Sequence, residues 1–383
     1  MKHYRICDGK FEFVKEISDS GPAPSYIIRS KCKKFLYCTS EIPKSLESGV
    51  CAFSCDGNEI TFINRVTSEG VSPCHLCFDD SGSYIFVSNY MGGNVVVLPV
   101  SSDGSLSRAC QAVSHKAPLL INDEVKIPNR SSAHVHQCIY LAPSSTILVC
   151  DLGLDTVFSY SWSRTEGDVR PKLSESSRWH CPAQAGPRHL AVHPSGGYAY
   201  LLSEIDCTLA ALKLDATRGS IVPSSQYQYH PLMRSGEPTG SMNAAEVIVS
   251  QDGRFVYASN RDVSGGNRDT VSSKFEVAGR SNCSISVFGV GDDGASLTFL
   301  QQVHSRGRHP RGMTLELRGG SPVLLVANKD DGCDSRLPGG NLVCFPVDNE
   351  TGLLKVESAV VTEGTVTDGG DGAIIEPTWI LAL

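Results

Sequence analysis

The chain has 383 residues, of which 40% are hydrophobic and 20% charged, and its formal net charge is −7. This composition is typical of globular proteins, and the absence of a basic run excludes a surface built for nucleic acid, which needs clustered Lys and Arg. Because no apolar stretch approaches the ~20 residues of a membrane helix, and the N-terminus lacks the apolar core of a secretory signal, we expect a cytoplasmic protein without a membrane partner.

The elements follow a pattern of three short strands that recurs along the chain. Residues 3–6 and 10–17 read as two strands at the N-terminus. Six copies of the pattern then follow, at residues 24–62, 73–100, 134–160, 187–214, 245–261 continued at 284–290, and 310–347. The copies at 73–100 and 187–214 align without a gap. Several copies end in a turn and a further strand, as at 101–113, 291–303 and 349–360.

This repetition predicts an all-β fold, a seven-bladed β-propeller of four-stranded antiparallel blades. The two N-terminal strands read as the third and fourth strands of a blade, and residues 376–381 read as its first strand. Joining the two ends closes the ring and removes exposed sheet edges. The second strand of this last blade has no clear counterpart, so either the blade is incomplete or the chain begins downstream of its natural start.

The whole chain, residues 1–383, is predicted to form a single domain, because no linker separates two independent patterns. Four longer and more polar segments are predicted to be loops within or between blades, the last of them an insertion: 107–133, 163–186, 215–243 and 262–282.

The 15 cysteines are scattered singly through apolar runs. An odd number without a signal peptide argues against a disulfide framework. Cys74 and Cys77 have C-x-x-C spacing, but residues three apart on a strand face opposite sides of the sheet. We therefore expect these cysteines to be small apolar core residues.

In a propeller, residues at the start of each first strand and just past each second strand meet at one mouth of the central channel. Here the first group contains His134, His136, Arg188, His189, Glu246 and Arg311, and the second contains Asn89, Asp151, Glu204, Asn260, Arg261, Asn328 and Lys329. Charged side chains are costly to bury unpaired. They either pair with one another to cap the channel or form an active site.

Several motifs resemble the lactonase family of seven-bladed propellers: HVH at 134–136, GPRH at 186–189, SE at 203–204, AAE at 244–246, SNR at 259–261 and HPRG at 309–312. That family includes bacterial-type 6-phosphogluconolactonases and fungal carboxy-cis,cis-muconate lactonising enzymes. The resemblance extends from about residue 20 to residue 383. It implies an active site of His136, Arg188, Glu204 and Arg261. The chain departs from the family pattern in its short N-terminus, the insertion after Arg261 and a one-residue shift between His136 and Pro143.

Lactone hydrolysis needs a base to activate water and a cation to stabilise the oxyanion. Either Glu204 or His136 could be the base, and Arg188 and Arg261 could stabilise the oxyanion or grip an anionic group. We expect further substrate contacts from five residues, with the last two holding an anionic tail: His134, His189, Glu246, Arg311 and Lys329.

No cofactor is expected, and a covalent serine mechanism is disfavoured because a G-x-S-x-G elbow is absent. His134 and His136 share one face of a strand, which would suit a metal, but the arginines at the same mouth would repel a cation. No metal is therefore expected.

The leading hypothesis is hydrolysis of a sugar lactone, 6-phosphogluconolactone first, as in the pentose phosphate pathway. One alternative is a cycloisomerase acting on a muconate-like dicarboxylate, and another is a non-catalytic propeller used as an interaction platform. A small-molecule lactone is the expected partner of a monomer or weak homo-oligomer.

Overall fold

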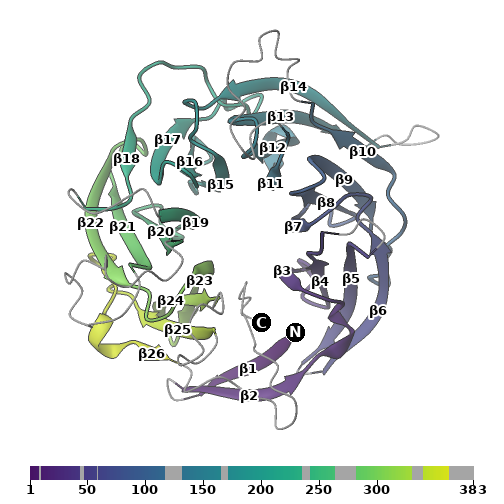
Figure 1. The fold of residues 1–383 in the computed structure, drawn as a ribbon, viewed down its shortest axis with the longest axis horizontal. Helices are drawn as coiled ribbons and strands as arrows, with labels where there is room; N and C mark the ends of the chain where they lie inside the picture. Colours follow the sequence, from purple (N-terminus) through teal and green to yellow (C-terminus); the bar gives the residue numbers. More distant parts are fainter. Residues whose placement is uncertain are drawn as a thin grey trace.

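The strands form a ring of antiparallel sheets around a common centre in the computed structural model (Figure 1). Within the described part of the chain there are six four-stranded sheets and one two-stranded sheet. The structure describes residues 1–7, 10–43, 47–57, 59–116, 132–164, 171–234, 242–263, 282–329 and 340–361.

Each four-stranded sheet is one blade, and its strands follow in chain order from the centre of the ring outward (Figure 1). The first three blades contain β3 (Pro24–Arg29), β4 (Phe35–Ser40), β5 (Gly49–Asp56) and β6 (Glu59–Thr67); β7 (Pro73–Phe78), β8 (Tyr84–Asn89), β9 (Asn94–Pro99) and β10 (Gln111–Ser114); and β11 (Val135–Leu141), β12 (Thr146–Asp151), β13 (Thr156–Ser163) and β14 (Lys172–His180).

The next three blades are built in the same way. They contain β15 (Pro187–Val192), β16 (Tyr198–Ser203), β17 (Thr208–Lys213) and β18 (Tyr229–Pro231); β19 (Met242–Val249), β20 (Phe255–Asp262), β21 (Ser284–Val290) and β22 (Leu297–His304); and β23 (Pro310–Arg318), β24 (Ser321–Asn328), β25 (Asn341–Pro346) and β26 (Val360–Val361). The two-stranded sheet is the hairpin of β1 (Lys2–Cys7) and β2 (Lys10–Glu16).

Single turns of 3-10 helix connect some strands, at η1 (Ser18–Ser20), η2 (Ala142–Ser144) and η4 (Val356–Ser358). Each is three residues long, and no helix in the described ranges has the length and apolar character needed to cross a membrane.

The second strand of a blade forms because it is a short apolar run enclosed on both faces by its neighbours. All six residues of β12 are buried, and only the first residue of β8 and of β16 is partly exposed. A short, continuous apolar run bounded by turns is typical of a fully buried strand. These runs are the most regular part of the repeat, which is why the blades are visible in the sequence.

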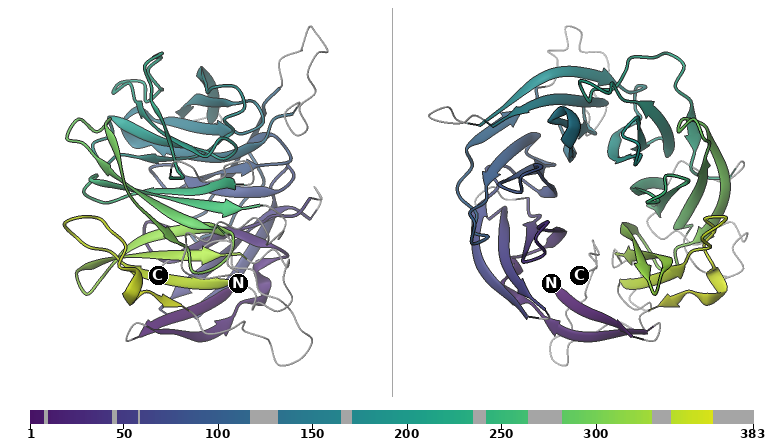
Figure 2. Two further views of the ribbon diagram at one scale, coloured as in Figure 1. Left: turned by 60° about the vertical axis from the view of Figure 1, so that its left-hand side comes forward. Right: turned by 180° about the vertical axis from the view of Figure 1, so that it is seen from behind.

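The hydrophobic core lies between the blades. Buried side chains of adjacent blades form one cluster at each contact, for example Leu202 and Leu209 with Val256 and Phe288. The hairpin β1–β2 lies between the first and last four-stranded blades, towards the outer edge of the ring, and the view from behind shows the same position (Figures 1 and 2).

Apolar residues attach this hairpin to both of its neighbours. Met1 and Ile17 pack with residues of β4 and β5, and Ile6 and Phe11 pack with residues of β24 and β25. The hairpin therefore occupies the seventh position of the ring, and its two strands lie where third and fourth strands were predicted.

The all-β propeller with four-stranded antiparallel blades is confirmed, whereas two of the predicted loops were wrong. Strand β14 lies within 163–186, and β18 lies within 215–243. Both are outermost strands, β14 largely exposed and β18 only partly buried, so their sequences lack an apolar pattern. The strand predicted at 376–381 and nearly all of the insertion at 262–282 lie outside the described residues.

Candidate active site

The innermost strand of each four-stranded blade carries a β-bulge near its beginning. In β15, Pro187 pairs with Ser203 and His189 pairs with Leu202, which leaves Arg188 as the extra residue. The same irregularity occurs in the other five innermost strands, at residues 25–26, Cys74, His136, residues 245–246 and Arg311. Bulges redirect side chains and are common beside active sites.

The bulge explains how two consecutive residues reach one cluster. In a regular strand the side chains of Arg188 and His189 would point to opposite faces. Here Arg188 bonds Glu204, and His189 contacts His136 and Glu246. The blade thus contributes two neighbouring side chains to the channel.

A second set of channel positions follows the second strand of each blade. In each innermost strand the residue just before the bulge pairs with a residue of the second strand, and that partner is followed in sequence by Glu41, Tyr90, Leu152, Glu204, Arg261 or Lys329, one in each blade. The candidate site therefore consists of equivalent positions in different blades, occupied by different residue types.

A glycine holds these two sets together in the fourth blade. Gly186 has a positive φ of 66°, its N–H donates to Oδ1 of Asp155 at 2.8 Å, and its carbonyl accepts from the N–H of Glu204 at 2.7 Å. A Cβ at Gly186 would lie 2.6 Å from Cγ1 of Ile205. The position requires glycine, and it fixes Glu204 beside the start of β15.

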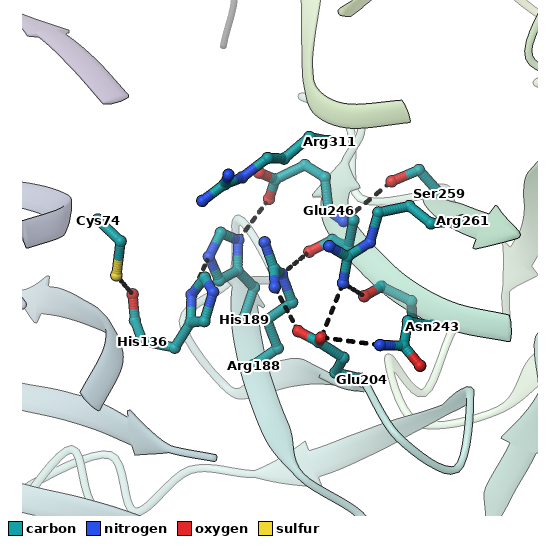
Figure 3. A network of polar contacts seen from close by, with 12 residues as sticks. Cys74, His136, Arg188, His189, Glu204, Asn243, Glu246, Ser259, Arg261 and Arg311 are labelled. Atoms are coloured by element: carbon teal, nitrogen blue, oxygen red, sulfur yellow. Dashed lines mark hydrogen bonds and ion pairs between the residues drawn. The ribbon is translucent and has the colours of Figure 1, made fainter. Parts of the chain in front are cut away.

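Glu204 lies between two buried guanidinium groups (Figure 3). Its Oε2 accepts from Nη1 of Arg188, and its Oε1 accepts from Nη2 of Arg261 at 2.9 Å and from Nδ2 of Asn243 at 3.2 Å. Both arginines also donate to backbone carbonyls of residues 244–245, at 2.8 and 2.9 Å. The guanidinium groups are thus fixed in position before any ligand binds.

These ion pairs decide the charge of Glu204. Burial raises the pKa of its carboxyl, but Arg261 and Arg188 outweigh burial and hold this pKa at about 2. Burial lowers the pKa of Arg261 to about 10, which leaves this side chain cationic at neutral pH. A carboxylate with so low a pKa binds protons weakly at neutral pH and is a poor general base.

A chain of hydrogen-bonding groups runs through three neighbouring blades, from His136 of β11 through His189 of β15 to Glu246 of β19 (Figure 3). Nδ1 of His136 lies 3.1 Å from Nε2 of His189, and Nδ1 of His189 lies 2.9 Å from Oε1 of Glu246. All three residues are buried, with relative exposures between 3% and 4%.

Burial, with Arg188 as the next cause, lowers the pKa of both His136 and His189 well below the usual range of histidine. Both rings are therefore neutral at neutral pH. Burial raises the pKa of Glu246 to about 8, against the opposing effects of the Val247 N–H and of Arg188. Glu246 is therefore mostly protonated at neutral pH, unlike Glu204.

A third cation reaches the site from the sixth four-stranded blade. Nη2 of Arg311 donates to Oε1 of Glu41 at 3.0 Å and to Oε2 at 2.8 Å. Burial lowers the pKa of Arg311, but Glu41 outweighs burial and leaves this pKa above its usual value.

The remaining two predicted substrate residues are His134 and Lys329. The ring of His134 stacks on Tyr90, with centroids 4.7 Å apart, and its Nε2 lies 3.2 Å from Oγ of Ser132. Tyr90 also contacts His136 edge-on at 5.4 Å. Lys329 lies just past β24 and is half-buried.

The structure thus brings His136, Arg188, Glu204, Arg261, His189, Glu246 and Arg311 into one cluster (Figure 3). Four further residues of the cluster were not predicted from the sequence: Glu41, Tyr90, Asn243 and Ser259. Glu41 and Tyr90 occupy the position of Glu204 in their own blades, so a stricter alignment of the repeats could have found them. Ser259 accepts from the N–H of Glu246 and donates to the carbonyl of Pro310.

Four other polar residues from the predicted mouth have structural partners instead. They end or nearly end the second strands and bind neighbouring turns, strands or side chains: Asn89 to Ser68, Asp151 to His115, Asn260 to Ser284 and Asn328 to Ser305. Among the described residues, no three His, Cys, Asp or Glu side chains are arranged to hold a metal ion, and the cysteines are free thiols.

Comparison with known proteins identifies the family of the chain. Residues 3–367 match the family described as "Lactonase, 7-bladed beta-propeller". The chain is 29% identical over 343 residues to 6-phosphogluconolactonase of Bacillus subtilis (strain 168), an alignment that covers 88% of this chain and 84% of the relative. It is 25% identical over 360 residues to 6-phosphogluconolactonase of Formosa agariphila, covering 93% and 90%.

Among solved structures, the chain resembles the periplasmic gluconolactonase of Pseudomonas aeruginosa with a TM-score of 0.73. The alignment covers 92% of this chain and 89% of the other, at 23% sequence identity. A similarity at this identity supports the fold alone.

Proposed function

The chain belongs to the lactonase family of seven-bladed β-propellers, and we propose that it hydrolyses a sugar lactone, with 6-phosphogluconolactone as the substrate. The proposal rests mainly on one observation: a neutral histidine, His136, shares a channel with the three guanidinium groups of Arg188, Arg261 and Arg311. The relatives named 6-phosphogluconolactonase support the choice of substrate.

His136 is the base in this proposal. Its lowered pKa means that the ring does not keep a second proton, but its Nδ1 is directed at His189, so the ring can pass one proton on as Nε2 accepts another from water. Nε2 is the nitrogen left for water, because it makes no hydrogen bond to another described residue. General base catalysis of this kind contributes roughly 10²–10⁴-fold to a rate. Glu204, the other candidate from the sequence, is held ionised by its two arginines.

Arg188 and Arg261 stabilise the negative charge that develops on the lactone carbonyl oxygen. Glu204 accepts one hydrogen bond from each guanidinium group and so holds both in place before the reaction. Fixed donors aimed at a developing oxyanion need little reorganisation in the transition state, which makes them effective catalysts. In this proposal Glu204 positions the arginines.

Arg311 and Lys329 bind the phosphate of the substrate. Arg311 uses only Nη2 for Glu41, so its remaining N–H groups can donate to phosphate oxygens. Lys329 occupies in its blade the position that Glu204 and Arg261 occupy in theirs, and it adds a second positive charge. A phosphate monoester carries a charge of about −1.5 to −2 near neutral pH, which these two cations would balance.

A parallel turnover assay tests the proposal. The purified chain would be mixed with freshly made 6-phosphogluconolactone, with unphosphorylated gluconolactone and with a muconate-type dicarboxylate, and the spontaneous rate subtracted. We expect catalysed hydrolysis of both lactones, with kcat/KM higher for the phosphorylated one by ~10²-fold, because two charge-assisted contacts are lost without phosphate. No acceleration on either lactone would contradict the proposal, and turnover of the dicarboxylate alone would support a cycloisomerase.

A further inference from the structure

The carboxyl group of Glu246 has one oxygen without a partner. Its Oε1 accepts from the N–H of Val247 at 3.0 Å and lies 2.9 Å from Nδ1 of His189. Its Oε2 is buried and has no hydrogen-bond partner among the described residues. Burying a polar atom unpaired costs about 1–3 kcal/mol. The Glu246 carboxyl has no role in the proposed lactone hydrolysis so far.

Charged and titratable groups face Glu246 from several blades. Arg188 and His189 of β15 act on Glu246 directly, and Arg311 of β23 and Arg261 of β20 act electrostatically on its partner His189. Tyr26 of β3 also interacts electrostatically with Glu246. Despite these cations, burial dominates, so Glu246 can change its protonation state within an ordinary working range of pH.

The two histidines must transmit that change. A neutral imidazole has one N–H and one lone pair. An ionised Glu246 can only accept hydrogen bonds, so Nδ1 of His189 then carries a proton and Nε2 of His189 accepts from Nδ1–H of His136. Nε2 of His136 is left with its lone pair and can act as a base.

Protonation of Glu246 reverses the chain. A proton on Oε2 would have no acceptor, so Oε1 is the favoured site, where Nδ1 of His189 accepts it. Nε2–H of His189 then donates to Nδ1 of His136, and Nε2 of His136 carries a proton directed away from His189.

We infer that Glu246, His189 and His136 form a proton relay in which Glu246 stores the proton removed from the attacking water. This inference rests on the proposed lactonase function for its role in catalysis. In it, His136 is the catalytic residue that contacts the water, whereas His189 and Glu246 are positioning residues that act through it.

The relay balances over one turnover. Water gives a proton to Nε2 of His136, Nδ1–H of His136 passes to Nε2 of His189, and Nδ1–H of His189 passes to Oε1 of Glu246. The resulting hydroxide adds to the lactone carbonyl carbon. When the ring C–O bond breaks, the stored proton returns along the same path to the leaving ring oxygen, and Glu246 is ionised again.

The test is a titration of the free protein by NMR with ¹⁵N-labelled histidine, because imidazole nitrogen shifts report the tautomer without substrate. Signals would be assigned with His136→Gln and His189→Gln. We expect both rings to exchange tautomers together as the pH rises through about 8, the pKa of Glu246, and to keep one tautomer in Glu246→Gln. Tautomers that stay constant in the wild type would overturn the relay.

Kinetics supply the second readout. Wild-type kcat is expected to rise with pH to a plateau above about 8, whereas Glu246→Gln should show a flat profile with kcat lower by ~10–10²-fold and KM nearly unchanged. A variant that keeps the wild-type profile would overturn the relay. A tautomer exchange in a protein that hydrolyses no lactone would leave the relay standing and contradict the proposed function.

Discussion

Arg311 and Glu41 form an ion pair across 270 residues of sequence, with N···O distances of 3.0 and 2.8 Å. Arg311 belongs to the sixth four-stranded blade and Glu41 follows the second strand of the first. The pair therefore joins the two blades that flank the hairpin β1–β2. The pair is partly exposed, with side-chain exposures of 22% and 18%, so a ligand can reach it.

If Arg311 binds phosphate, its removal should affect one substrate selectively. Arg311→Ala is expected to raise KM for 6-phosphogluconolactone by ~10–10²-fold, the value of a charge-assisted contact, and to leave unphosphorylated gluconolactone nearly unchanged. Steady-state kinetics on both lactones measure this. Equal losses on both substrates would show that Arg311 acts on the shared reacting group or on the fold instead.

The two arginines around Glu204 should matter to the transition state. Arg188→Lys keeps the charge but loses the forked geometry that reaches both Glu204 and the Ala245 carbonyl. We expect kcat to fall by ~10²-fold with little change in KM, as for loss of an oxyanion donor. The matched control is Arg178→Lys, an exposed arginine of β14 paired with Glu175, which should leave kcat unchanged. A similar kcat in both variants would contradict the assignment.

Glu246 should also give the folded protein a particular pH dependence. Its pKa is about 8 in the folded state and 4.5 as the reference value, so between these values the folded chain keeps a proton that the unfolded chain releases. The contribution of Glu246 to the free energy of unfolding is therefore full below about pH 4.5. It falls by about 1.4 kcal/mol per pH unit until about pH 8.

Urea unfolding of the wild type and of Glu246→Gln at several pH values measures that contribution, because glutamine does not titrate. The stability of the variant relative to the wild type should increase as the pH rises through the window. A difference that stays constant from about pH 5 to about pH 8 would contradict the raised pKa of Glu246.

Gly186 allows a test of how the site is held in place. Gly186→Ala combines a positive φ of 66° with a Cβ 2.6 Å from Ile205. Gly196→Ala, in the turn between β15 and β16, has a similar φ of 73° but no atom within 4 Å of its Cβ. Both should lose about 1–2 kcal/mol from backbone strain.

Only Gly186→Ala should also lose activity, because the clash displaces the residues that hold Arg188 beside Glu204. Thermal unfolding and kcat separate the two effects. Equal kcat values in the two variants would show that the turn at Gly186 does not position the site.

The ring could be predicted from the sequence because packing repeats. Buried second strands such as β12 and β16 are apolar runs at a fixed spacing, and the residues that differ between copies, such as Arg188 and Arg261, mark the channel. The outer strands β14 and β18 could not be found in this way, since β14 is mostly exposed, β18 is only partly buried, and neither carries a periodic apolar pattern.

The roles of the individual site residues were harder to predict from the sequence. No local pattern shows that a bulge lets both Arg188 and His189 reach the channel, although proline at the start of four innermost strands, as in Pro187, is a hint. Glu204 and Glu246 look alike in sequence. Their pKa values differ because Glu204 lies between two arginines, whereas Glu246 is buried with one oxygen unpaired.

The central claim is that His136 activates water for lactone hydrolysis, and one comparison tests it most directly. It is the kcat/KM on fresh 6-phosphogluconolactone of the wild type, of His136→Gln and of His180→Gln, an exposed histidine at the end of the outermost strand β14. We predict a wild-type rate well above spontaneous hydrolysis, a loss of at least ~10²-fold in His136→Gln and a change of only a few-fold in His180→Gln. A wild-type rate equal to the spontaneous one, or full activity in His136→Gln, would contradict it.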